Sequence, residues 1–152
     1  MTLPPAEDQA RRFRRVREAH RAEMQEDYVE LIADLIAATG EARAADLAER
    51  FGVTAATVTN TLGRLKRDGL IETQPYRSVF LTARGAELAA RARQRHQLVV
   101  RFLVGLGVSC EAAEMDAEGL EHHLSPETLA VMARFSAGSG ASADSPPSRP
   151  PN

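Results

Sequence analysis

Hydrophobic positions recur with helical spacing near the start of the chain. From His20 to Thr39, apolar side chains return every three or four residues, the period of one face of an α-helix. The residues of this stripe are Tyr28, Leu31, Ile32, Leu35 and Ile36. Gly40 follows as a favourable helix stop. The pattern predicts a long amphipathic helix, preceded by an N-terminal extension over residues 1–19 in which helix is expected from about Ala6.

The next segment predicts two short helices joined by a tight turn. Residues 43–51 have a short apolar face, and Gly52 closes it. Thr54 is a good N-cap for a second helix that runs to about Arg67. The buried side of this second helix is predicted to carry Val58, Leu62 and Leu65. Two short helices around a glycine-containing turn are typical of a helix-turn-helix.

A short alternating pattern follows the second helix. Residues 70–73 and 78–81 alternate apolar and polar side chains, and the four residues between them include Pro75. Such a pattern predicts a β-hairpin. The helix-turn-helix followed by a hairpin predicts a winged helix-turn-helix.

Three further helices are predicted after the hairpin. The first runs from about Thr82 to Gly105, the second from the N-cap Ser109 through His123, and the third starts at Pro126 after the N-cap Ser125. The fold class is therefore mainly α, with a small β-hairpin wing. The expected organisation is an N-terminal extension (1–19), a winged helix-turn-helix domain (20–83), a helical region (84–137) and a disordered tail (138–152) rich in Ser, Gly, Ala and Pro.

The charge pattern separates the middle of the chain from its flanks. The net charge is −2, but residues 43–95 carry ten Lys/Arg against five Asp/Glu, a balance of +5. Residues 1–42 and 96–152 carry −3 and −4. A basic middle between acidic flanks indicates one module for a polyanion and another for a cation. A single cysteine and no bilayer-length apolar run predict a cytoplasmic protein without a disulfide framework or a membrane partner.

The exposed face of the second short helix is a candidate DNA-reading surface. The residues predicted to enter the major groove are Thr57, Asn60, Thr61 and Arg64, where Asn can pair with adenine and Thr can touch base edges. The residues predicted to contact phosphates are Lys66, Arg67, Arg77 and Arg84, with Arg77 at the wing tip. The alternative is a solvated helix face in a protein-interaction module. The order of elements and the local positive charge favour DNA.

A second constellation carries carboxylates and imidazoles. In a helical conformation, Glu118, Glu121 and His122 project from one face. Oxygen and imidazole donors without a thiolate favour a hard or borderline divalent cation over a structural zinc. Three donors do not saturate such an ion. Further candidates lie at the margins of other apolar stripes: Asp27, Glu30 and His96.

Each of these residues has a plain structural interpretation. Asp27 and Glu30 alone would be a solvated face, and His96 alone a satisfied histidine beside a core. Gly119, inside the motif, provides room for a close backbone approach, exposes a carbonyl to the ion, or packs against a neighbouring helix. Packing several carboxylates together without a counter-ion is costly, and a metal removes that cost.

At this point the chain resembles the manganese transport regulators, the short members of the diphtheria-toxin-repressor-like family of metal-dependent transcription factors. The motifs that carry the resemblance are Glu26-Asp-Tyr-Val-Glu-Leu-Ile32, Val79-Phe-Leu-Thr82, Arg95-His96 and Asp116-Ala-Glu-Gly-Leu-Glu-His-His-Leu-Ser125. It covers about residues 12–137, and no SH3-like domain follows, as expected for the manganese branch. The recognition helix departs from the family at Asn60 and Gly63, where lysine is common.

The resemblance implies a homodimer, with residues 20–83 as the DNA-binding domain and residues 84–137 as the helical linker and dimerisation domain. It implies that this homodimer binds double-stranded operator DNA and represses manganese uptake genes. It implies two Mn(II) ions per subunit, held by Asp27, Glu30, His96, Glu118, Glu121 and His122. Iron-responsive relatives carry methionine at the position of Asp27, so its oxygen favours manganese. No small organic ligand and no enzymatic activity are expected. Three alternatives remain: an iron-responsive repressor of this family, a metal-independent winged-helix repressor, and a dinuclear-metal helical enzyme.

Overall fold

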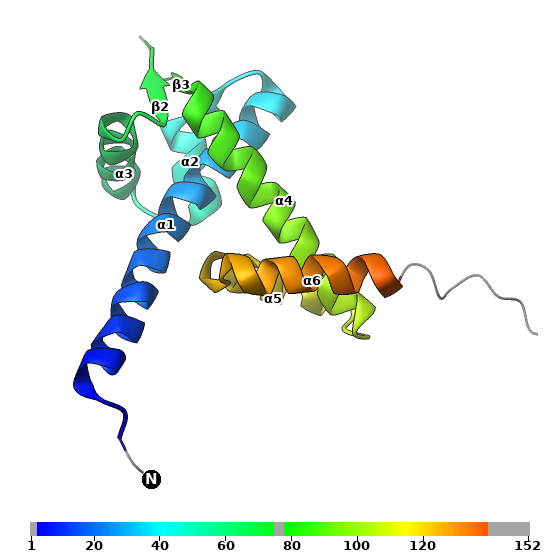
Figure 1. Cartoon of the computed structure of the whole chain (residues 1–152). Helices are drawn as coiled ribbons and strands as arrows, with labels where there is room; N and C mark the ends of the chain where they lie inside the picture. Colours follow the sequence, from blue (N-terminus) through cyan, green and yellow to red (C-terminus); the bar gives the residue numbers. More distant parts are fainter. Residues whose placement is uncertain (1–2, 75–77, 140–152) are drawn as a thin grey trace, which may run out of the picture. The chain divides into compact units, whose positions relative to one another are not determined.

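The structure is a computed structural model that describes residues 3–74 and 78–139. It divides into two compact units: unit 1 ends at Arg93 and unit 2 begins at Gln94. The elements (Figure 1) are, in chain order, α1 (Ala6–Thr39), β1 (Ala42–Arg43), α2 (Ala44–Phe51), α3 (Ala55–Arg67), β2 (Ile71–Thr73), β3 (Ser78–Leu81), α4 (Ala83–Gly105), α5 (Cys110–Leu120), the 3-10 helix η1 (Glu121–His123) and α6 (Pro126–Ser139). This mainly helical architecture with a small sheet confirms the predicted fold class.

The N-terminal extension and the first predicted helix are one continuous helix of 34 residues, α1. It begins at Ala6, as the sequence indicated, and ends where Gly40 adopts a φ of 83°, a conformation that glycine reaches without steric cost. The N–H of Gly40 donates to the carbonyl oxygen of Ile36 at 2.9 Å. The second half of α1 packs in the core, while its first half extends beyond the other elements of unit 1 (Figure 1).

Helices α2 and α3 form the predicted helix-turn-helix. The hydroxyl oxygen of Thr54 accepts a hydrogen bond from the backbone N–H of Thr57 at 3.2 Å, which confirms the predicted N-cap of α3. The buried side of α3 includes Val58, Leu62 and Leu65, as predicted. The core of unit 1 joins these residues to side chains of α1, α2 and the sheet, and Tyr28 stacks on Phe51 with ring centroids 4.4 Å apart.

The wing has three antiparallel strands in the order β1-β3-β2. The predicted hairpin corresponds to β2 and β3, where Ile71 pairs with Leu81. Strand β1 was not predicted from the sequence, because a strand of two residues is too short to show an alternating pattern. In this strand, Ala42 pairs with Val79 of β3. The predicted turn spans residues 74–77, of which residues 75–77 lie outside the described residues; the N–H of Gln74 donates to the carbonyl oxygen of Ser78 at 3.0 Å.

The start of α4 is fixed by a close backbone approach. The Thr82 hydroxyl donates to the carbonyl oxygen of Gly69 at 2.7 Å and accepts from the N–H of Gly85 at 3.1 Å. A Cβ added at Gly85 would lie 2.0 Å from the carbonyl oxygen of Leu70, so no larger residue fits there without a shift of the backbone. This contact ties the wing to the helix that continues into unit 2.

Unit 2 contains the end of α4 together with α5, η1 and α6. Its core contains Val99, Ala117 and Met132, and Phe102 meets Phe135 edge to face at 5.4 Å between ring centroids. Ser109 and Ser125 act as N-caps: their hydroxyls accept from backbone N–H groups at 3.3 and 3.2 Å.

The prediction that the second of these helices continues through His123 is wrong. The α-helix ends at Leu120, and residues 121–123 form the 3-10 helix η1. The reason lies just downstream, where Leu124 is extended and Ser125 already caps the next helix. A 3-10 turn has three residues per turn and is frequent at the C-terminus of an α-helix, where the chain leaves the helical path. The predicted disordered tail falls almost entirely outside the described residues, and the described helices include none with the length and apolar character of a membrane span.

Candidate metal centre and nucleic-acid interface

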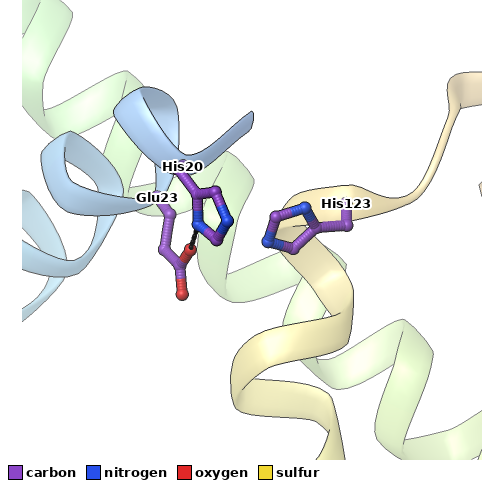
Figure 2. Close-up of side chains that lie close together, drawn as sticks. All are labelled: His20, Glu23 and His123. Carbon is purple, nitrogen blue, oxygen red and sulfur yellow. Dashed lines mark hydrogen bonds and ion pairs between the residues drawn. The ribbon is translucent and has the colours of Figure 1, made fainter. Parts of the chain in front are cut away.

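One face of α1 carries a row of potential metal donors. Asp27 and Glu30, the two donors predicted on this helix, are both partly buried. Residues spaced by three and four positions lie on the same helix face, so Glu23 and His20 continue their row toward the N-terminus. His20 Nδ1 and Glu23 Oε2 lie 3.3 Å apart and form a hydrogen bond (Figure 2). Sequence reasoning missed these two residues, although their spacing was the available signal.

In unit 2, a buried carboxylate lies between two imidazoles. Glu121 and His122 are both buried, with 2% and 8% of their surface exposed. The Oε1 atom of Glu121 is 3.4 Å from Nε2 of His122 and 3.6 Å from Nδ1 of His96. The structure therefore brings together three of the six predicted donors, from α4 and η1. Glu118 is exposed on α5.

Glu114 belongs to this cluster and was missed by the sequence reasoning. Its Oε2 atom lies 2.8 Å from Nε2 of His96. An ionised carboxylate is an acceptor only, so the hydrogen must lie on Nε2. A neutral His96 ring then has its lone pair on Nδ1, the nitrogen that faces Glu121. The sequence held a signal, since Glu114, Glu118 and Glu121 follow the i, i+4, i+7 spacing of one helix face.

The charges around His96 favour a positive group. Burial lowers the pKa of His96, but the hydrogen bond with Glu114 and the negative charges of the nearby glutamates outweigh burial and raise this pKa above its ordinary value. The imidazole of the metal-free protein therefore holds its proton more firmly than a free histidine does. The negative charges that hold this proton on His96 would also attract a metal cation to the same position.

The donor set of unit 2 fits a divalent cation. Adjacent ligands of an octahedral ion with bonds of about 2.1 Å lie roughly 3 Å apart. The separations of 3.4 and 3.6 Å around Glu121 come close to this spacing. Carboxylate and imidazole donors suit manganese, iron or zinc, and they lack the thiolates of a structural zinc site. In unit 1, Asp27 and Glu30 offer carboxylate donors for such an ion. In unit 2, the donors are the carboxylate of Glu121 and the imidazoles of His96 and His122.

The candidate DNA-reading face of α3 carries three of the four predicted residues. Thr57, Asn60 and Arg64 are exposed on α3. The hydroxyl of Thr57 also bonds that of Thr54 at 2.9 Å, which holds it at the first turn of the helix. This face offers an amide, a hydroxyl and a guanidinium, the groups that read base edges in the major groove.

The prediction that Thr61 lies on the DNA-reading face is wrong. Only 2% of its surface is exposed. It follows Val58 by three positions and precedes Leu65 by four, so it falls on the margin of the buried stripe, and α1 covers that side of α3. Its hydroxyl lies 3.4 Å from Nη2 of Arg64. Thr61 therefore orients a neighbour and does not lie on the exposed face.

The residues predicted to contact phosphates flank this face. Lys66 and Arg67 are exposed at the end of α3, and Lys66 Nζ donates to the hydroxyl of Thr73 on β2 at 3.0 Å. Arg84, at the start of α4, donates to the carbonyl oxygen of Asp68 at 3.1 Å. Arg77 lies outside the described residues. Because three of these four side chains stand next to α3, they provide positive charge beside the candidate reading face.

These features define a class of protein. Unit 1 is a winged helix-turn-helix with an exposed polar and basic recognition helix, and unit 2 carries a carboxylate–imidazole cluster suited to a divalent cation. A DNA-binding module combined with a metal-binding helical module is the organisation of a metal-dependent DNA-binding regulator.

Comparison with known families gives the same class. Residues 21–79 match the N-terminal DNA-binding domain of iron-dependent repressors, and residues 82–137 match their metal-binding and dimerisation domain. The chain belongs to the iron-dependent repressor family. It is a transcriptional regulator and not an enzyme.

Relatives and solved structures agree with this assignment. The chain is 55% identical over 139 residues to the transcriptional regulator MntR of Escherichia coli O6:H1, a match that covers 91% of this chain and 90% of the relative. It is 52% identical over 142 residues to MntR of Salmonella typhimurium, covering 93% and 90% of the two chains. A structure described as a manganese-dependent transcriptional repressor in complex with manganese matches with a TM-score of 0.62 and 30% identity, over 73% of this chain and 51% of that one. The chain thus spans about half the length of that structure.

Proposed function

We propose that this protein is a manganese-responsive transcriptional regulator, which binds operator DNA as a homodimer and represses manganese uptake genes in the cytoplasm when manganese is plentiful. The observation that carries the proposal is the buried carboxylate of Glu121 between the imidazoles of His96 and His122. This cluster occurs in a chain whose other unit is a DNA-binding domain. A solved structure to which the chain is 30% identical is described as a manganese-dependent transcriptional repressor in complex with manganese, which supports the choice of metal.

The donors favour manganese by their hardness. The proposed ligands are Asp27, Glu30, His96, Glu118, Glu121 and His122, a set of four carboxylates and two imidazoles. We propose that these six side chains would hold two ions per subunit. Oxygen-rich sites suit Mn(II), whereas softer donors favour other metals. Asp27 supplies an oxygen where iron-responsive members are expected to carry methionine, so its carboxylate supports manganese over iron.

The ligands divide between the two units, and this division provides the proposed mechanism. Asp27 and Glu30 belong to α1 of the DNA-binding unit, and the other four ligands belong to α4, α5 and η1. A bound cation supplies the positive charge that lets these carboxylates approach one another. Without it, their mutual repulsion favours arrangements in which the two recognition helices of a dimer do not match two half-sites. Metal binding then selects the DNA-binding arrangement.

Exposed apolar side chains support the homodimer. On unit 2, large hydrophobic residues remain accessible in the described chain: Val104, Leu106, Met115, Leu120, Val131 and Phe135. Met115 has 72% of its surface exposed on α5. Clusters of exposed apolar side chains mark protein–protein interfaces. The match of this unit to a metal-binding and dimerisation domain favours a second copy of the chain as the partner.

The test is operator binding against free manganese. An operator is first selected from sheared genomic DNA with the manganese-loaded protein, and a labelled duplex of that sequence is titrated by fluorescence anisotropy. Glu121→Gln keeps the size of a buried side chain but removes its charge, so we expect it to abolish the manganese-dependent gain in affinity. Asp116→Asn removes an exposed charge from α5 and is the matched control. Wild-type affinity that does not change with manganese would overturn the proposal.

Iron is the second candidate because the family carries its name. The same titration with anaerobic Fe(II) separates the two metals. We expect activation by Mn(II) at lower free concentration than by Fe(II), since hard oxygen donors dominate the set. Activation by iron alone would assign the protein to iron sensing.

A further inference from the structure

The first half of α1 contains a dense group of arginines with no role in the function proposed above. Residues 11–21 hold six arginines and one acid, Glu18, a balance of +5. All six arginines are exposed. The segment ends at residue 21, where the match to the DNA-binding domain begins. The net charge of −3 over residues 1–42 conceals this basic segment.

Three of these arginines share one helix face. At 3.6 residues per turn, Arg14, Arg17 and Arg21 lie within about 60° of one another around α1. Further along, the same face carries Tyr28 and Ile32 into the core. N-terminal to these core residues, the same face of α1 carries the three arginines. Glu18 lies at its edge and reduces the local charge from +3 to +2.

The position of this face relative to α3 identifies the partner. Arg21 and Gln25 of α1 line a cavity of about 180 Å³ together with Arg64 of α3 and Asp68, the residue at the C-cap of α3. Gln25 Nε2 donates to Asp68 Oδ2 at 2.7 Å across the two helices. Helix α1 therefore flanks the recognition helix, on the side of its buried Thr61, and the arginine face continues from this contact.

The dimensions of DNA place phosphates on this flank. Packed helices have axes about 8–10 Å apart. The major groove is about 12 Å wide, so a helix packed beside one that occupies the groove lies over its rim. The rim is formed by the phosphate backbone. Arginine is well suited to contact phosphates because its guanidinium presents two parallel N–H groups.

We propose that Arg14, Arg17 and Arg21 form a second DNA-binding surface. This surface contacts the phosphate backbone beyond the part that the recognition helix covers. Contacts of this kind add affinity and salt dependence without adding sequence specificity. The proposal rests on the proposed function, since it needs a protein that binds duplex DNA. It assigns a purpose to the part of α1 that precedes the matched domain.

The test compares two variants with the same loss of charge. Arg14→Gln with Arg17→Gln removes two charges from the proposed surface. Arg12→Gln with Arg15→Gln removes two charges from another face of the same helix, roughly 100–160° away from Arg14. Glutamine is a good helix former, so α1 is retained. Binding of the selected operator duplex is measured with manganese at several salt concentrations, and the slope of log affinity against log salt is compared.

We expect the Arg14/Arg17 variant to lose about two to four units of this slope in a dimer, because each phosphate contact contributes about 0.9. The Arg12/Arg15 variant should keep the wild-type slope, and Arg14→Lys with Arg17→Lys should restore most of it. Equal slopes for the two glutamine variants would overturn the proposal. If manganese does not change the operator affinity of the wild-type protein, the proposed function is wrong. The comparison of salt slopes between the variants would still be valid, so the two failures are distinguishable.

Discussion

The hydrogen bond between Glu114 and His96 leads to a specific prediction for metal affinity. Glu114→Ala removes the acceptor of the Nε2 hydrogen, which lies 2.8 Å from the carboxylate. The His96 ring then loses the partner that fixes its tautomer and directs the Nδ1 lone pair toward Glu121. A partner of this kind raises the basicity of a ligating histidine and holds its orientation.

The exposure of Glu114 sets the size of the effect. Loss of such a partner costs about 10–100-fold in metal affinity. The Glu114 side chain is 61% exposed, so water competes for the hydrogen bond. We therefore expect the low end, about 10-fold, which corresponds to about 1.4 kcal/mol. Glu114→Gln keeps a neutral acceptor, and a neutral hydrogen bond is about half as strong as a charge-assisted one, so its loss should be about 3-fold.

Two measurements test this prediction. The electron paramagnetic resonance signal of free Mn(II) gives the dissociation constant, with Glu111→Ala as the control because Glu111 is an exposed acid on the same helix. Nitrogen NMR of the metal-free protein reports which ring nitrogen of His96 carries the hydrogen. An unchanged manganese affinity in Glu114→Ala, or a hydrogen on Nδ1 of neutral His96 in the wild type, would refute the reasoning.

Three further predictions concern stability. Gly85→Ala should lower the free energy of unfolding by about 1–3 kcal/mol or more in a urea titration, because a Cβ would lie 2.0 Å from the carbonyl oxygen of Leu70; a neutral result would show that the backbone can shift. Gly119→Ala should raise stability by up to about 1 kcal/mol, since, apart from its chain neighbours and the nearby backbone of its own helix, no described atom lies within 4 Å of the new Cβ; destabilisation would mean that the glycine has a contact partner. In metal-free protein, the raised pKa of His96 means that its stabilising charge is fully present below about pH 6.5 and is lost as pH rises through this pKa. The stability difference between wild type and Glu114→Ala, a few tenths of a kcal/mol, should therefore be present at pH 6 and decrease by pH 9, and a difference that grows with pH would contradict the sign.

Local signals allowed much of the fold to be predicted. Thr54, Ser109 and Ser125 each cap a helix where expected, because a capping hydroxyl bonds a backbone N–H within its own turn. The predicted helix-turn-helix and wing follow from short-range periodicity. Features set by distant partners were not predictable: β1 exists only through its pairing with β3, and Thr61 is buried only because α1 covers it.

The candidate site shows the same limit. Glu121 and His122 were identified from their spacing, and their burial beside His96 supports this choice. Glu114 was missed because its spacing to Glu118 and Glu121 is a weak signal, which gains meaning only when the fold places His96 next to it. Gly119 has open space around it, so the predicted close backbone approach is not seen in the described part of the chain. Its interpretation as an accessible carbonyl stays a prediction.

The central claim is that metal binding and operator binding are coupled in one equilibrium. Such coupling is reciprocal, so each ligand must raise the affinity for the other by the same factor. The most direct measurement is the manganese dissociation constant of the dimer with and without saturating operator duplex, by isothermal titration calorimetry. We expect operator duplex to increase the affinity for manganese by the same factor by which manganese increases the affinity for operator. A manganese affinity that is the same with and without operator would contradict it.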